Sequence, residues 1–192
     1  LSLHDALPIL KAGSSIASSS SNVSVIGDVL SMTGNLATTG TLTVAPYSNS
    51  FASTLVWPPS TLTLANTISG LTLGKSVNTA GITIGSTTSI AGPINIYGGA
   101  VAVNAALNTT NTTTGDIAIT TTGLTGGGGI GLATGRSLSI TQSGTSTYGG
   151  VVSGSLISLT KLGIGELNLS AASTYTGDTL VNARSEEHTS EL

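Results

Sequence analysis

The chain has 192 residues, 26 of them glycine and none cysteine, with 3% aromatic residues, 7% charged residues and a formal net charge of -3 at pH 7. Without cysteine there is neither a disulfide framework nor a thiolate metal site. Without a cluster of Lys and Arg the chain lacks the positive charge that nucleic-acid binding needs, so we expect no nucleic-acid partner. No apolar run is long enough for a membrane-spanning helix.

The two ends differ from the rest of the chain. LSLHDALPI at residues 1–9 and RSEEHTSEL at residues 184–192 resemble translated DNA adapters of sequencing libraries. We therefore expect both ends to be artefacts and residues 10–183 to form the domain. The alternative is a short amphipathic lead-in and a charged, solvated tail. Without the ends the chain loses both histidines, His4 and His188, and its charges balance. They are Lys11, Lys75, Arg136 and Lys161 against Asp28, Asp116, Glu166 and Asp178.

Between the ends a short unit recurs in which two aliphatic residues flank one small or polar residue. This alternation predicts short strands with one buried face. Gly, Asn, Ser and Thr separate the units and are typical of turns, while no stretch shows helical periodicity with caps. The expected strands begin at Val23, Leu42, Leu62, Leu71, Ile82, Ile94, Val101, Ile117, Ile130, Leu138 and Leu167.

These units predict an all-β solenoid. Each unit buries only two or three side chains, and the Asn-Gly or Asp-Gly loops of tight hairpins are missing. We therefore predict a right-handed parallel β-helix with two or three short strands per coil. At roughly 20 to 24 residues per coil it would have about seven or eight coils and a length of about 35 to 40 Å. The alternative fold is an antiparallel β-sandwich.

The segment at residues 47–60, YSNSFASTLVWPPS, interrupts the pattern. It holds three of the six aromatic residues, Tyr47, Phe51 and Trp57, and the pair Pro58-Pro59. Proline cannot donate a ladder hydrogen bond, so we expect a loop or side excursion from the rod. Trp57, Tyr47 and Phe51 are candidate ligand contacts that would stack on a sugar ring or a partner protein. The alternative is that they cover one flank of the coil.

Two further motifs are better explained as turns than as binding sites. GGGGIG at residues 126–131 has the Gly-x-Gly-x-x-Gly spacing, but a turn and a strand follow it instead of the helix that a dinucleotide site needs, so we predict a corner. Asp28, Asp116 and Asp178 each follow a glycine at a strand entry and are expected to cap turns. A calcium ladder is the alternative for these three acids. We predict no cofactor and no metal.

The segment LTKLGIGELNLSAASTYTGDTLVNA at residues 159–183 resembles the autotransporter-associated β-strand repeat of bacterial surface proteins. That repeat follows Leu-x-Lys-x-Gly-x-Gly-x-Leu-x-Leu and later Tyr-x-Gly-x-Thr-x-Val. Ile164, Asp178 and the run at residues 171–173 depart from it. Residues 115–144 are similar to filamentous haemagglutinin-like secreted adhesins. The matching repeat positions are Leu159, Lys161, Gly163, Gly165, Leu167, Leu169, Tyr175, Gly177, Thr179 and Val181.

The resemblances imply a passenger fragment of a type V secreted protein, either an autotransporter or a two-partner adhesin. Such a protein is exported to the surface of a Gram-negative cell or released from it. The implied function is a stalk or adhesive surface without catalysis, whose partners are glycans, other cells or further copies of itself.

The alternative function is that of a fragment of a carbohydrate-active β-helix enzyme, a polysaccharide lyase or hydrolase. Its candidate residues are Glu166 and Asp178, the two acids close enough in sequence to lie on neighbouring coils, with Lys161 nearby. Residues 10–183 contain neither His nor Cys, so Ser-His and Cys-His nucleophiles cannot be assembled within them.

Overall fold

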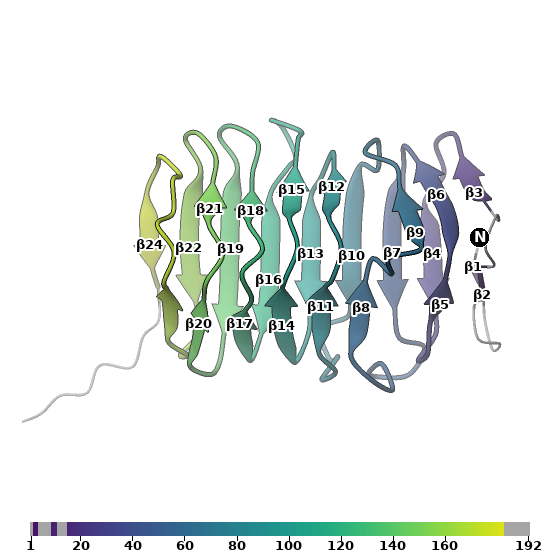
Figure 1. Ribbon diagram of the computed structural model, residues 1–192, viewed down its shortest axis with the longest axis horizontal. Coiled ribbons are helices and arrows are strands. Elements are labelled where there is room, and N and C mark those ends of the chain that lie inside the picture. The colour runs from purple at the N-terminus through teal and green to yellow at the C-terminus, as the bar shows by residue number, and fades with distance from the viewer. Residues whose placement is uncertain (1, 4–8, 11–14, 183–192) are drawn as a thin grey trace, which may run out of the picture.

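The computed structural model describes residues 2–3, 9–10 and 15–182, and in this part of the chain it contains strands and turns but no helix. No described segment is therefore a helix suited to crossing a membrane. The chain winds as a parallel β-solenoid of about 8 turns, with the coils side by side along one axis (Figure 1). Neighbouring coils pair in parallel throughout the described strands. The predicted solenoid is confirmed, and the alternative of an antiparallel sandwich is wrong.

Each complete coil contributes one strand to each of three walls, which agrees with the two or three strands predicted. The first wall is one continuous sheet of β1 (Ser2–Leu3), β4 (Val23–Ile26), β7 (Thr41–Ala45), β10 (Gly70–Gly74), β13 (Ile94–Tyr97), β16 (Ile117–Thr121), β19 (Ser137–Gln142), β22 (Ser158–Leu162) and β24 (Thr179–Val181).

The other two walls are interrupted. The second wall consists of β2 (Ile9–Leu10) with β5 (Ser31–Met32), then β8 (Leu55–Trp57), β11 (Ile82–Ile84), β14 (Ala100–Val103) and β17 (Gly123–Thr125), then β20 (Ser146–Tyr148) with β23 (Leu167–Leu169). The third wall consists of β3 (Ser15–Ser18), β6 (Gly34–Thr38) and β9 (Leu62–Leu64), then β12 (Thr88–Ile90), β15 (Leu107–Thr109), β18 (Ile130–Gly131) and β21 (Val152–Ser153).

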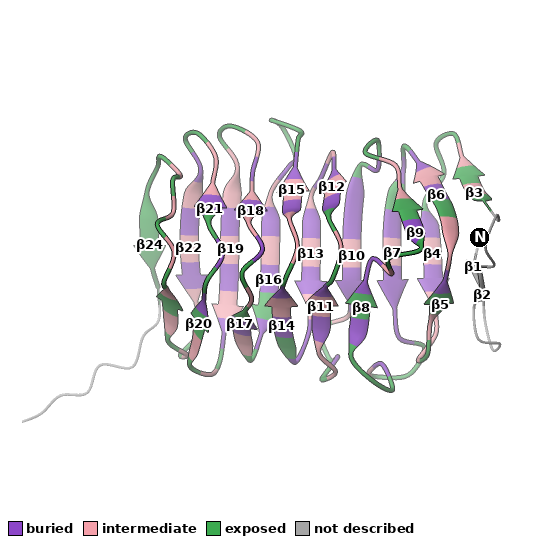
Figure 2. Ribbon diagram, viewed as in Figure 1, coloured by how far each residue is buried: buried purple, intermediate pink, exposed green. Residues whose placement is uncertain are grey.

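Inward aliphatic side chains stack in register from coil to coil and form the core. Buried residues accordingly recur along the strands of the walls (Figure 2). Burying each such side chain contributes about 1.5 to 3 kcal/mol. In the first wall, one inward ladder is Val23, Leu42, Leu71, Ile94, Ile117, Leu138 and Leu159. The steps along this ladder are 19, 29, 23, 23, 21 and 21 residues, close to the predicted coil length except at the second step. The matching outward row is Ser24, Thr43, Thr72, Asn95, Ala118, Ser139 and Thr160.

All eleven expected strands coincide with observed strands, but several further strands were not expected. Several of the unexpected strands have a polar residue at an inward position. In β12 and β15, for example, Thr88 and Thr109 are buried where the pattern would require an aliphatic residue. The Thr109 hydroxyl donates a hydrogen bond to the Gly115 carbonyl at 2.5 Å, which satisfies its buried oxygen.

The glycine run at residues 126–131 forms a corner, as predicted, and leads into strand β18. Gly126 has a φ of 107°, in the left-handed region that favours glycine, and a side chain there would collide with the Val103 carbonyl. A side chain on Gly128 would collide with the backbone of Ala105. The buried Tyr148 hydroxyl donates a hydrogen bond to the Gly128 carbonyl, and burial raises the pKa of Tyr148. The corner is therefore packed against its neighbouring coils on both sides.

A matched pair of alanine substitutions tests this corner. Gly127 has no atom within 4 Å of an added Cβ, so Gly127→Ala should change the free energy of unfolding by less than about 0.5 kcal/mol. Gly128→Ala should destabilise the protein by about 1 to 3 kcal/mol, because the backbone of the adjacent coil must move. Urea denaturation of the two variants measures both values. Equal stabilities would contradict the close approach of the coils at Gly128.

Candidate functional site

The most distinctive feature of the rod is a break that interrupts two walls at the same coil. In the second wall β5 pairs with β2 and β8 pairs with β11, but among the described strands β5 and β8 do not pair. In the third wall the same holds between β9 and β12. The first wall continues through β4, β7 and β10 without interruption. One continuous sheet therefore joins the two stacks on either side of the break.

The segment between β8 and β9 crosses the break. Strand β8 belongs to the later stack because it pairs with β11, whereas β9 belongs to the earlier stack because it pairs with β6. Pro58 and Pro59 lie between them and have no N–H to donate to a ladder. This crossing lies in the 29-residue step from Leu42 to Leu71. The extra residues thus carry the chain forward to β8 and back to β9.

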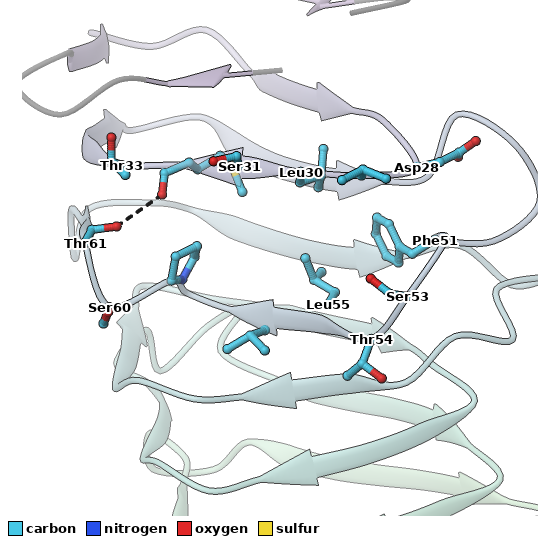
Figure 3. Close-up of a pocket in the computed structure, with 14 residues that line it drawn as sticks. Asp28, Leu30, Ser31, Thr33, Phe51, Ser53, Thr54, Leu55, Ser60 and Thr61 are labelled. Atoms are coloured by element: carbon cyan, nitrogen blue, oxygen red, sulfur yellow. Dashed lines mark hydrogen bonds between the residues drawn. The ribbon is translucent and has the colours of Figure 1, made fainter. Parts of the chain in front are cut away.

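The break leaves an opening in each interrupted wall. In the second wall a pocket of about 460 Å³ lies between β5 and β8 (Figure 3). Two backbone hydrogen bonds close its ends, from the Ala52 amide to the Asp28 carbonyl and from the Gly34 amide to the Thr61 carbonyl, each at 2.9 Å. In the third wall a second opening, of about 610 Å³, lies between β9 and β12.

The second-wall pocket combines apolar and hydroxyl side chains. Phe51 and Leu55 point into the space between the two stacks in Figure 3, and Leu30 also lines the pocket. The Asp28 carboxylate is turned away from them and accepts a hydrogen bond from the Ser48 amide at 2.8 Å. The remaining lining residues include Met32, Pro59 and the hydroxyl residues Ser31, Thr33, Ser53, Thr54, Ser60 and Thr61.

The prediction of a loop at residues 47–60 needs correction. Leu55–Trp57 is strand β8 of the second wall, and Trp57 and Phe51 are 0% and 5% exposed. Both side chains pack in the core. The predicted role as a surface ligand contact is therefore wrong for Trp57. Phe51 reaches only the floor of the pocket. The alternative, that the aromatic residues cover the coil, fits these two. Tyr47 is 59% exposed, and its role in ligand contact stays a prediction.

Two substitutions at Trp57 distinguish a core residue from a ligand contact. The indole Nε1 is buried without a hydrogen-bond partner among the described residues, so Trp57→Phe removes volume but no hydrogen bond. Trp57→Ala should destabilise the protein by about 3 to 5 kcal/mol, and Trp57→Phe by clearly less. Thermal and urea unfolding measure the two values. Equal losses, or no loss with alanine, would contradict the buried position.

A buried amide holds the floor of the pocket in place. The Asn78 Oδ1 accepts hydrogen bonds from the Phe51 amide at 3.2 Å and from the Ser50 hydroxyl at 2.9 Å. Its Nδ2 donates to the Tyr97 carbonyl on the next coil at 2.8 Å. Asn78 therefore fixes Phe51 relative to the later stack. Nothing in the sequence singles out this residue, because an isolated Asn in a turn-rich chain carries no pattern of its own.

A second interruption of the second wall, between β17 and β20, is sealed by side chains. The fully buried Gln142 accepts a hydrogen bond from the Leu124 amide at 3.2 Å through Oε1 and donates to the Glu166 carbonyl at 2.5 Å through Nε2. The Ser146 hydroxyl also accepts from the Leu124 amide, at 3.0 Å. These side chains replace missing ladder bonds. At the break, the Thr61 hydroxyl donates a longer hydrogen bond, of 3.4 Å, to the Met32 carbonyl.

The repeat-like residues form the last coils of the described rod. Leu159 is buried, Leu167, Leu169 and Tyr175 are half-buried against the core, and Thr179 and Val181 are exposed in β24. The Tyr175 hydroxyl lies 2.5 Å from the Thr179 hydroxyl. Gly163, Gly165 and Gly177 sit at corners where a side chain would collide with the preceding coil. The motif residues thus lie in the strands, core and corners of the last coils, and none of them lines the second-wall pocket.

Lys161 interrupts an otherwise aliphatic ladder. It pairs with Ile140 on one side and Val181 on the other, and it is 7% exposed, at a position that is aliphatic in the preceding coils. Its ammonium donates hydrogen bonds to the Leu162 carbonyl at 2.7 Å and the Gly163 carbonyl at 3.0 Å. Burial lowers the pKa of Lys161. The side chain therefore combines an apolar stem in the core with a cation that caps its own corner.

The lowered pKa of Lys161 predicts a pH-dependent stability. Between the lowered pKa of the folded state and the ordinary value near 10.4, the unfolded chain binds more protons, so stability rises with pH. We expect the stability of the natural chain relative to Lys161→Met to increase as the pH rises toward about 10.4. Urea denaturation across this range measures the difference. Parallel pH profiles for the two proteins would contradict the effect.

The other predicted charges are dispersed. Asp28 and Asp116 cap turns as expected, each accepting a backbone amide of the next coil, from Ser48 and Ser137 respectively, at 2.8 Å. Arg136 lies 3.9 Å from the Asp116 carboxylate. Within the described residues no three His, Asp or Glu side chains gather in one place, so these acids do not form a ladder.

The acids considered for the alternative enzyme lie near the same end of the rod as Lys161. Glu166 precedes β23 of the second wall and Asp178 precedes β24 of the first wall, and both are exposed. The Lys161 ammonium is directed at backbone carbonyls.

Most residues of the two adapter-like ends lie outside the part of the chain that the structure describes. Residues 184–192 lie wholly outside them, and of residues 1–9 the structure describes Ser2–Leu3 and Ile9, in β1 and β2. The interpretation of both ends as translated adapters stays a prediction.

Comparisons of the chain with family models, curated proteins and solved structures find no match. The fold is therefore established by the structure alone, as a parallel β-solenoid. The resemblance of residues 159–183 to a surface-protein repeat rests on the matching motif positions in the sequence alone.

Proposed function

We propose that the chain is part of the passenger of an exported bacterial surface protein and acts as a rigid, adhesive rod. The observation that carries this proposal is the continuous first wall, in which an aliphatic ladder lies inside and a row of short, mostly polar side chains lies outside. A stack of this kind holds its shape because every coil is bonded to its neighbours. It presents the same kind of surface along its length.

The resemblance of residues 159–183 to autotransporter-associated repeats supports the export of this rod to a Gram-negative cell surface. The outward residues of the first wall, such as Thr43, Thr72 and Asn95, offer hydroxyl and amide groups that suit contact with glycans. The same surface suits contact with another copy of the chain. In this proposal the coils supply stiffness and the outer side chains supply adhesion, without a chemical reaction.

A display experiment tests the proposal. The full chain is fused to an outer-membrane translocator barrel, and the adhesion of the displaying cells to immobilised glycans and to one another is measured. We expect adhesion several times above that of cells displaying the barrel alone. Turnover of a polysaccharide by the purified chain, without adhesion, would support the alternative enzyme instead.

A matched pair of variants shows whether adhesion depends on the folded rod. Ile96→Asp places a charge in the buried ladder and should abolish protease resistance and adhesion together, because an unpaired buried charge is strongly destabilising. Asn95→Asp, on the outward face next to it, should leave the fold intact. If Ile96→Asp removes protease resistance but the cells still adhere, that result would contradict a role for the folded rod.

A further inference from the structure

We propose that the second-wall pocket at the break binds one neutral sugar ring, held as a terminal or branch residue of a glycan. The inference rests on the adhesive function proposed above and assigns it a specific contact. It depends on the shape of the pocket, on the unpaired edges that border it and on its charge.

The shape of the pocket favours a compact ligand. Its volume of about 460 Å³ lies in the range of small-molecule sites. Backbone hydrogen bonds at Ala52 and Gly34 close both of its ends along the wall. An extended peptide that continued in both directions would have to cross these bonds, whereas a single ring can enter from outside.

The borders of the pocket offer hydrogen bonds that a polyhydroxyl ligand can use. In β8 the Leu55 amide and the Trp57 carbonyl bond to the β11 side, through Gly81 and Gly85. Neighbouring residues of a parallel strand bond to opposite sides, so the amide and carbonyl of Val56 face the break. Side chains of Ser31, Ser53 and Thr61 add hydroxyl groups around the same space.

The floor of the pocket suits the C–H face of a sugar. Phe51 and Leu55 are directed into it, Leu30 also lines it, and Asn78 fixes the Phe51 backbone from behind. A ring placed between these side chains and the hydroxyl border would bury its apolar face and keep its hydroxyl groups hydrogen-bonded. The third-wall opening lacks an aromatic residue in its lining. The second-wall pocket is therefore the better sugar site of the two.

The charge of the pocket favours a neutral sugar over an acidic one. Its lining includes no Lys or Arg, and its single carboxylate, Asp28, already accepts the Ser48 amide. A sialic or uronic acid would bring a second negative charge near Asp28 without a cation to balance it.

The pocket also differs from the other interruption of the same wall. Between β17 and β20 the amide of Gln142 and the hydroxyl of Ser146 satisfy the strand edges. At the break the Thr61 hydroxyl donates a longer bond, of 3.4 Å, to the Met32 carbonyl of β5, and the backbone bonds at Ala52 and Gly34 lie at the two ends of the opening. The break therefore retains space and hydrogen-bonding groups for a ligand.

Titration of the full chain with methyl glycosides of glucose, galactose, mannose and N-acetylglucosamine, followed by calorimetry or ligand-detected NMR, tests the proposal. We expect at least one neutral glycoside to bind and N-acetylneuraminic acid to bind at least tenfold more weakly. Ser53→Phe, which fills the pocket from its exposed border, should weaken binding at least tenfold. Ser86→Phe, in the third-wall opening, is the matched control and should leave the affinity unchanged.

The outcomes separate this inference from the proposed function. Adhesion of the displayed chain that is unaffected by Ser53→Phe, with no glycoside bound, would overturn the sugar site and leave the adhesive rod standing. Equal effects of Ser53→Phe and Ser86→Phe, preferential binding of the acidic sugar, or displacement by an extended peptide would also overturn it. Loss of glycoside binding in Ser53→Phe with an unchanged unfolding transition would support it.

Discussion

The register of the first wall is the constraint on which the rest of the molecule depends. Because side chains alternate between the two faces of a strand, a shift of one residue would move the aliphatic ladder to the outside. The ladder from Val23 to Leu159 stays inward through every coil, although the coils differ in length. Coil length can therefore vary only where the walls turn or are interrupted, and the longest coil is the one that contains the break.

The break shows how an irregular coil fits into a regular stack. Pro58 and Pro59 occupy the crossing where no ladder bond is available, and Trp57 fills the core beside them. Asn78 ties the preceding excursion to the next coil through hydrogen bonds at both ends of its amide. The consequence is a local opening whose borders are polar and whose floor is apolar, while the sheet opposite is undisturbed.

Much of the fold could be predicted from the sequence, because the aliphatic alternation that marks a strand is also what the interior requires. Units such as those at Ile94 and Ile117 are buried as expected. The inward Thr109 of β15 and the inward Gln142 at the end of β19 carried no such signal, because the carbonyls that satisfy them, those of Gly115 and Glu166, lie elsewhere in the chain. The pocket could not be predicted either, because it too depends on contacts between distant parts of the chain. Its two borders lie more than twenty residues apart in the sequence. The sequence also does not distinguish Trp57 and Phe51, which are buried, from aromatic residues that are exposed.

The interruption of two walls at one coil also has a mechanical consequence. When a rod of this kind is pulled along its axis, tension passes from coil to coil through the ladders of all three walls. At the break only the first wall transmits the tension through a continuous ladder. A few single hydrogen bonds, such as that from Gly34 to Thr61, add to this wall. Extension under load will therefore start at this coil, and the molecule will yield as two stiff segments joined by a single sheet.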